Sequence, residues 1–360
     1  MRAGRLSRHV AARALAAFLG SLAAVVGLFL AVDYAENAGI YRGPGWVLAT
    51  AELYLNRAAV VTGQLAPAAM LLAAAVTASG LRKTREYTAM RSVGLGPFSV
   101  AAPVVAVCAA IAVLLALFGD VVVVRAQERA DQIMADQFHR TDRDVLRARE
   151  PKRWFRGKDG HRIFHLRGTG EGGAYERVTI LELTDGFTLA RRIDAARMRP
   201  TGDGGWVLED VEERAFAPQP AWSREASRVV HFDEDPASFA VRGGLPSQFR
   251  RAALGEQIAL RSRLGLPTSD FALEWHRRLS YPLAGIPAAL VALALALRRE
   301  RKGHLTAALV EAVGVSFVYW GLDGVALSLG HAGRLSPAAA AWAPAAVFLV
   351  LGAAALRRVA

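Results

Sequence analysis

Three ionisable side chains lie in or beside one long apolar stretch near the carboxyl end of the sequence: His304, Glu311 and Asp323. A histidine and two acids could transfer protons to a lipid-linked substrate. A charge near the centre of a bilayer costs about 2.5 to 3.5 kcal/mol, so such acids face protein or water. We expect Glu311 to pair with Arg298 or Arg299. Because the three are spread along one helix without a companion cluster, we keep a lipid-modifying enzyme only as the less favoured alternative.

Several motifs of known chemistry are missing from the sequence. It contains no G-x-x-x-x-G-K-[ST] run to hold nucleotide phosphates, no H-E-x-x-H, no G-x-S-x-G and no Cys/His cluster. We therefore expect no catalytic residue, no metal and no cofactor. Any work driven by ATP would be done by another chain.

Arginines near the predicted ends of apolar segments offer a different chemistry, because a guanidinium binds phosphate through two parallel hydrogen bonds. Each one alone is best interpreted as an anchor at the membrane interface. As a set they could hold a phosphate: Arg42, Arg57, Arg277, Arg278 and Arg334.

The elements that must position these residues are predicted membrane spans. Hydrophobic residues make up 53% of the chain, and about 20 apolar residues cross a bilayer core. The first four of six candidates carry no charge, the fifth carries Glu311 and Asp323, and the sixth contains two prolines. The six are Ala14–Val32, Ala58–Leu81, Phe98–Gly119, Leu279–Leu297, Leu305–Leu329 and Leu335–Leu356.

Basic residues predict the orientation, because short basic loops stay on the cytoplasmic side. Arginines precede span one and end the chain, and arginines with a lysine join spans two and three and spans four and five. Both termini are therefore expected in the cytoplasm. We predict spans one to three in 1–119, an external domain in 120–270 and spans four to six in 271–360. Span one is expected to be an uncleaved anchor, with a cleaved signal peptide as the alternative. The net charge of +12 is explained by topology, without nucleic-acid binding.

The external segment is predicted to be β structure. Asp-Gly turn signals separate short β-prone runs, which favours an antiparallel sandwich or jelly roll. In the run "RVTILEL", Val178 and Ile180 fall on one strand face and Leu181 on the other. A strand buried between two sheets explains this pattern. The alternative is a sandwich that opens to hold acyl chains, with Ile180 and Leu181 among the contacts.

A short amphipathic helix is predicted between spans two and three, at about residues 84–93. Thr84 is expected to cap it, and Gly94, Gly96 and Pro97 to end it. Tyr87, Met90 and Val93 recur at helical spacing among the charges Arg85, Glu86 and Arg91. Such spaced anchors suit the groove of a partner protein, whereas an interfacial helix in the lipid head groups is the alternative.

The block "QLAPAAMLLAAAVTASGLRKTREYTAMRSVGLGPFSVAAPVV" resembles the second span, coupling helix and third span of the lipopolysaccharide export permeases, the F and G half-permeases of an ABC exporter. "DGFTLARRIDAARMRPTGDGGWVLEDVEERAF", "HFDEDPASF", "EWHRRLSYPLAG" and "GVSFVYWGLDGVALSLGHAGRLSPAAAAWAPAAVF" are similar to later blocks of that family. The order of six spans, with the external domain between spans three and four, is also the family's. The resemblance thus covers nearly the whole chain.

This resemblance implies an α-helical inner-membrane protein with six spans and an inserted periplasmic antiparallel β-jelly-roll domain. Two half-permeases would pair, extract lipopolysaccharide and pass it to a periplasmic bridge protein, driven by a cytoplasmic ABC ATPase dimer. The match places the ATPase contact at Arg85, Glu86, Tyr87, Met90 and Arg91.

One departure concerns the substrate contacts. Relatives in the G branch carry lysines at the outer end of span one, where this chain has Leu30, Glu36 and Asn37. The five arginines above are candidate replacements for binding the anionic lipid. Asp323 aligns with an acidic residue in the family's span five and is a further candidate, for lining the lipid cavity. The F or G assignment stays open. An exporter of lipoprotein or of another glycolipid, and a membrane scaffold, remain as alternatives.

Overall fold

The computed structural model describes residues 2–139, 153–157, 160–167, 174–201, 205–216, 219–232, 245–263, 265–298 and 305–359. It divides into two compact units, which are described separately. The helical unit comprises Met1–Arg140, Pro246–Gly255 and Pro267–Ala360, and the β unit comprises Thr141–Leu245 with Glu256–Leu266.

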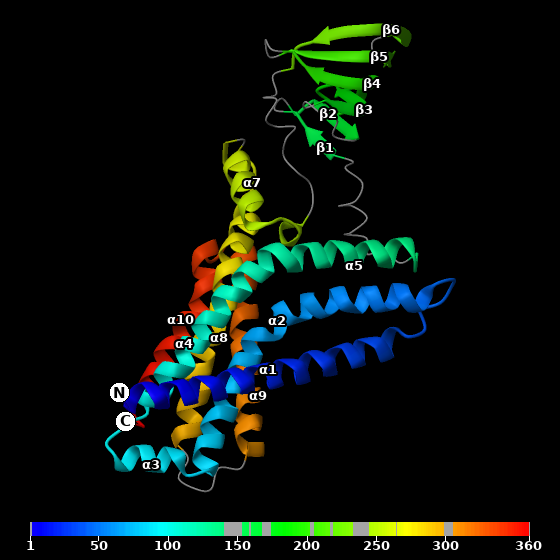
Figure 1. The fold of residues 1–360 in the computed structure, drawn as a ribbon. Helices are drawn as coiled ribbons and strands as arrows, with labels where there is room; N and C mark the ends of the chain where they lie inside the picture. The colour runs from blue at the N-terminus through cyan, green and yellow to red at the C-terminus, as the bar shows by residue number, and fades with distance from the viewer. Residues whose placement is uncertain are drawn as a thin grey trace. The chain divides into compact units, whose positions relative to one another are not determined.

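Six helices in the described part of the chain are long and apolar enough to cross a membrane, which confirms the predicted number of spans. Five of them extend beyond the apolar runs predicted from the sequence. The helices are α1 (Arg2–Asn37), α2 (Trp46–Lys83), α4 (Phe98–Phe118), α8 (Ser269–Arg298), α9 (Leu305–His331) and α10 (Pro337–Arg357) (Figure 1).

Small residues allow these helices to approach closely, as is common for helices that pack in a membrane. The core of the unit is rich in alanine from α2, α4 and α8. A methyl group added at Gly352 of α10 would lie 2.9 Å from Cβ of Leu290 and 3.1 Å from the backbone nitrogen of Val291 in α8. The α8–α10 interface therefore depends on the missing side chain at this glycine.

Two neighbouring helices of the unit change direction at one level (Figure 1). Helix α4 continues through a π-helical segment, Gly119–Val123, into α5 (Val124–Asp136). Helix α2 contains Pro67, which removes one hydrogen bond of the helix. A methyl group at Gly63 of α2 would lie 3.1 Å from the side chain of Val123, so the bent segments pack against each other.

Helix α5 belongs with the membrane helices by its packing. Its Ala130 and Ile133 form a small cluster with Tyr41 and with Leu53 of α2. Arg129 of α5 also pairs with Glu52 of α2 at 2.7 Å. The helical unit thus extends past Gly119, where the third apolar run of the sequence ends.

A short 3-10 helix (Pro246–Gln248) and α7 (Arg251–Arg263) precede α8. The backbone nitrogen of Arg251 donates to the Asp120 carboxylate at 2.7 Å, and the Arg251 guanidinium lies 4.2 Å from the ring centroid of Trp275. These contacts fix the start of α7 beside the π-helical segment and α8.

The β unit contains one antiparallel sheet of six described strands, which confirms the predicted antiparallel domain. Each strand pairs with the next, so the described pairings are those of a meander and include no Greek-key crossing of a jelly roll. The strands are β1 (Arg153–Arg156), β2 (Arg162–Arg167), β3 (Tyr175–Leu183), β4 (Leu189–Pro200), β5 (Trp206–Ala215) and β6 (Ala221–Val230).

The core of the β unit lies on one face of this sheet, with Phe164, Ile180, Trp206 and Leu208 almost fully buried. The spacing of buried residues widens once from two to three in each of β3, β4 and β5, where two residues that are not buried stand between consecutive buried ones. These changes in spacing lie at one level across the sheet. At that level, one residue of each strand from β3 to β6 has no partner on the neighbouring strand. These residues, which we call the unpaired row, are Arg177, Ala196, Asp210 and Ala226.

Candidate functional site

The predicted short helix is present as α3 (Glu86–Ser92). It begins after Arg85, whose backbone is left-handed with φ 59°, and Gly94 with φ 81° follows its end. Thr84 does not cap α3, as the sequence suggested, but ends α2: its hydroxyl donates to the Gly80 carbonyl at 3.1 Å. A threonine at a helix end can donate to the carbonyl four residues earlier. Thr84 makes this bond within α2 and does not cap the first turn of α3.

One side of α3 is buried in its own chain. Tyr87 and Met90 are each 5% exposed and belong to the core of the helical unit, together with Val10 of α1 and Val100 of α4. Val93 is 72% exposed, because it follows the last residue of α3 and is not held on the helical face. The apolar side chains that we expected to enter a partner's groove therefore attach α3 to the chain's own core.

Glu86 joins α3 to the start of α1. Its carboxylate accepts from Arg13 at 2.8 Å and contacts a ring nitrogen of His9 at 3.0 Å. The hydroxyl of Thr84 shares its single hydrogen between the Gly80 carbonyl and this carboxylate, which lies 2.7 Å away. This hydrogen bond from Thr84, supported by His9 and Arg13, holds the pKa of Glu86 below its usual value. The carboxylate is consequently charged near neutral pH and can maintain the α1–α3 contact.

Arg82, at the end of α2, adds a contact to α8. Its guanidinium donates to the carbonyl oxygen of Leu297 at 2.5 Å and to that of Ala296 at 3.3 Å. Helix-terminal carbonyls lack partners within the helix and carry partial negative charge, so an arginine is a suitable partner. The region around α3 is thus joined to α1, α2, α4 and α8, while a second side stays open. The exposed residues of that side are Arg85, Thr88, Ala89, Arg91 and Ser92.

The five candidate lipid-binding arginines do not form one site. Arg57 is ion-paired with Asp33, lies 5.5 Å from the ring centroid of Tyr54 and donates to the Tyr41 hydroxyl at 3.3 Å. Its charge is therefore already compensated inside the hairpin of α1 and α2. Arg42 and Arg334 are exposed, and their side chains make no hydrogen bond or ion pair with other described residues, so both guanidinium groups could receive an anion.

Arg278 and Arg277 are neighbours in sequence with different surroundings. Arg278 donates to the carbonyl oxygens of Ser247 at 2.7 Å and Phe249 at 3.0 Å, and to Glu274 at 3.0 Å, so it holds the connector before α7 against α8. Arg277 of α8 lies 3.9 Å from the carboxylate of Asp323 in α9. Asp323 is 9% exposed, which agrees with a buried acid that has a partner in its own chain.

Two other predicted contacts concern the fifth span. Glu311 is half-buried in α9, and the sequence suggested that it pairs with Arg298 or Arg299. Arg299 and His304 lie outside the described residues. The expected pair of Glu311 therefore stays a prediction.

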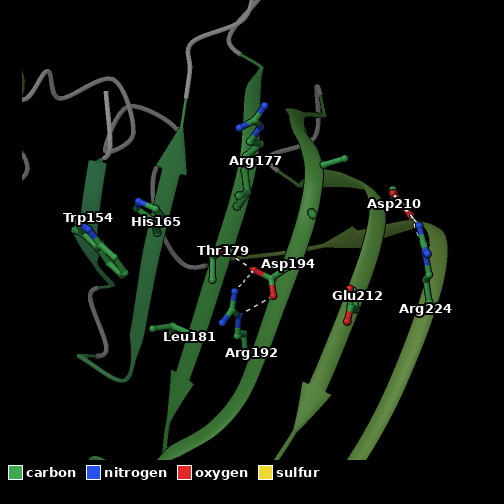
Figure 2. Close-up of a pocket in the computed structure, with 13 residues that line it drawn as sticks. Trp154, His165, Arg177, Thr179, Leu181, Arg192, Asp194, Asp210, Glu212 and Arg224 are labelled. Carbon is green, nitrogen blue, oxygen red and sulfur yellow. Dashed lines mark hydrogen bonds and ion pairs between the residues drawn. The ribbon is translucent and has the colours of Figure 1, made fainter. Parts of the chain in front are cut away.

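The two candidate residues in the β unit lie on opposite faces of β3. Ile180 is fully buried in the sheet core, whereas Leu181 is half-buried and lines a hollow of about 530 Å³ on the other face (Figure 2). Polar side chains surround most of this hollow, which sequence reasoning missed. The signal was present in the apolar spacing, which changes from two residues to three between Ala195 and Met198 and between Leu208 and Val211.

These features define a class of protein: a membrane protein with six spans and an antiparallel β domain inserted between the third and fourth. The family model described as "Lipopolysaccharide export system permease LptF/LptG" matches residues 8–358, and the chain belongs to this family. It is therefore an inner-membrane transport subunit of a lipopolysaccharide export system. No curated protein matches the chain at a significant level.

Proposed function

We propose that this chain is one half-permease of an ATP-driven exporter and that α3 receives the force of a separate cytoplasmic ATPase dimer. Lipopolysaccharide would enter from the membrane and pass by way of the β domain to a periplasmic bridge protein. The termini and α3 would face the cytoplasm and the β domain the periplasm. The basic loops of the sequence support this orientation.

The attachment of α3 is the observation that carries the proposal. A helix that transmits force needs one side fixed to the moving spans and another side open to the motor. Tyr87 and Met90 supply the fixed side by burial, and Glu86 adds an ionic contact to α1. The exposed guanidinium groups of Arg85 and Arg91 supply charges for the partner. An interfacial helix resting in lipid head groups would instead turn its apolar residues outward.

A second copy of the fold would complete the transport path. Helix α1 packs on α2, but many of its large apolar side chains in the outer half stay exposed, including Leu28 at 68% and Phe29 at 46%. A homologous half-permease would pack against part of this surface, and lipid would cover the rest.

The test reverses one charge on the open side of α3. We expect Arg91→Glu to insert and fold normally, because Arg91 is exposed, and to reduce co-purification of the ATPase at least about tenfold, since like charges at an interface cost several kcal/mol. The measurement is the amount of ATPase that co-purifies with the solubilised chain, together with its ATP hydrolysis rate.

Arg358→Glu is the matched control, since Arg358 is an exposed arginine just after the end of α10. It should retain the ATPase. Normal ATPase binding and hydrolysis by the Arg91→Glu complex would contradict the proposed role of α3.

A further inference from the structure

The hollow on the β unit lies along the unpaired row, three of whose residues line it. The interrupted pairing of the strands explains why a hollow forms there. Ala196 stands at the centre of that row, between Arg177 of β3 and Asp210 of β5. Its methyl group leaves space that a larger exposed side chain would occupy. The hollow extends over β1 to β6, from Trp154 at one side to Arg224 at the other (Figure 2).

Fixed polar groups form the floor of the hollow. Asp194 accepts from Arg192 at 2.7 and 3.0 Å and from the Thr179 hydroxyl at 2.7 Å (Figure 2). Asp210 accepts from Arg224 at 2.9 and 3.1 Å. Charge-assisted and paired hydrogen bonds orient their groups, more firmly at Asp194, which also accepts from Thr179, than at the exposed Asp210–Arg224 pair. The floor thus presents oriented donors and acceptors without collapsing into the hollow.

The lining contains three arginines and three acids, but the acids are all paired with arginines other than Arg177. Asp194 is paired with Arg192, Asp210 with Arg224, and the third acid, Glu212, with Arg214 at 2.7 Å. The side chain of Arg177 makes no hydrogen bond or ion pair with other described residues. One guanidinium therefore remains for a ligand, and its natural partner is a phosphate or a carboxylate.

The backbone of Arg177 is also unusual. It is left-handed with φ 52°, and Asp210 in the same row has φ 50°. This conformation costs a side chain other than glycine roughly 1 to 2 kcal/mol. The strand thus keeps an arginine where glycine would fit best.

An aromatic pair lines the same hollow on β1 and β2, in the cross-strand row of Thr179. The ring of Trp154 stacks on that of His165 with centroids 4.2 Å apart and planes 18° apart. His165 is 8% exposed, whereas Trp154 is 60% exposed. The imidazole of His165 therefore covers one face of the Trp154 indole, and the rest of the indole is open to solvent. An open aromatic face next to oriented polar groups fits a ligand that has an apolar face and a polar edge.

We propose that this hollow binds a sugar ring that carries an anionic group. The ring would stack on Trp154, its hydroxyls would bond to the floor at Asp194 and Thr179, and Arg177 would hold the anion. The ligand is either the sugar head group of a membrane lipid or a free sugar phosphate. The site is argued from the hollow alone and does not rest on the proposed role of α3.

The test uses the full chain in lipid nanodiscs without the ATPase, so that failure of the α3 proposal cannot affect it. Binding is measured by saturation-transfer NMR with glucose 6-phosphate, glucose and inorganic phosphate as probes. We expect glucose 6-phosphate to bind more tightly than either of the others. Deacylated lipopolysaccharide should displace it if a lipid head group is the ligand and should leave it bound if a free sugar phosphate is.

Three variants assign the contacts. Arg177→Gly removes the guanidinium, and glycine adopts the left-handed backbone without strain. It should weaken glucose 6-phosphate binding at least about tenfold, since a charge-assisted bidentate pair is lost. Trp154→Ala should weaken both sugars and leave phosphate unchanged. Arg191→Ala is the control, because Arg191 is exposed on β4 and is not among the residues that line the hollow.

Several results would overturn the proposal. Absence of glucose 6-phosphate binding to the unmodified chain at about 10 mM is one. Unchanged affinity in Arg177→Gly is another. Equal binding of inorganic phosphate and glucose 6-phosphate, insensitive to Trp154→Ala, would show an anion site without a sugar contact.

Discussion

At the scale of residues, Arg277 and Asp323 show how an acid is kept within the fifth span. Asp323 is almost fully buried and its carboxylate lies 3.9 Å from the Arg277 guanidinium. A buried acid without a cationic partner is destabilising, because nothing compensates the free energy lost when its charge is removed from water. The sequence identified both residues as candidate lipid contacts, but it could not show that they face each other, because 46 positions separate them in the chain.

We therefore predict that Arg277→Met lowers stability by about 1 to 3 kcal/mol, since Asp323 loses its ionic partner while the side-chain volume is roughly kept. The measurement is the thermal unfolding midpoint in detergent. The double variant with Asp323→Asn should recover most of the loss. A double variant no more stable than Arg277→Met alone would show that the pair is not what stabilises this region.

At the scale of elements, close packing of α10 on α8 depends on Gly352. We predict that Gly352→Ala lowers the unfolding midpoint, with a loss of about 1 to 3 kcal/mol, because the added methyl group meets a Cβ and a backbone nitrogen that cannot move aside.

Gly324→Ala in α9 is the matched control. No atom outside its own helical surroundings lies within 4 Å of a methyl group added there, so the substitution should be neutral or slightly stabilising. Equal effects of the two changes would mean that helix propensity, and not the α8–α10 contact, decides the outcome.

The sequence predicted the kinds of elements well, because their signals are local. Apolar length identified the six spans, and turn residues identified the antiparallel strands and the short helix after α2. The partners of side chains were not predictable in this way. Glu86 meets Arg13 across 73 positions of sequence, and Tyr87 and Met90 show the same spacing whether they face a partner or their own core. Only the arrangement of α1, α4 and α8 decides between the two.

At the scale of the whole molecule, the orientation of the two units can be tested with single cysteines. The native Cys108 is 3% exposed and should not react with a charged maleimide. Ser92, the last residue of α3, and Ser227 in β6 are both exposed. We predict that Ser227→Cys is labelled in intact spheroplasts, whereas Ser92→Cys is labelled only after the membrane is permeabilised.

Each cysteine variant serves as the control for the other, since both should react equally in detergent. Labelling of Ser92→Cys from outside, or protection of Ser227→Cys, would contradict a cytoplasmic α3 and a periplasmic β domain.

The unpaired row also limits how the β domain can change over evolutionary time. Losing a single residue from β4 would leave a surplus residue in β3 and in β5 with no counterpart, and would turn one half of β4 onto its other face. A shorter strand is tolerable only when its neighbours shorten at the same place. Insertions and deletions in this domain should therefore arise in matched sets across adjacent strands, or be confined to the turns between them.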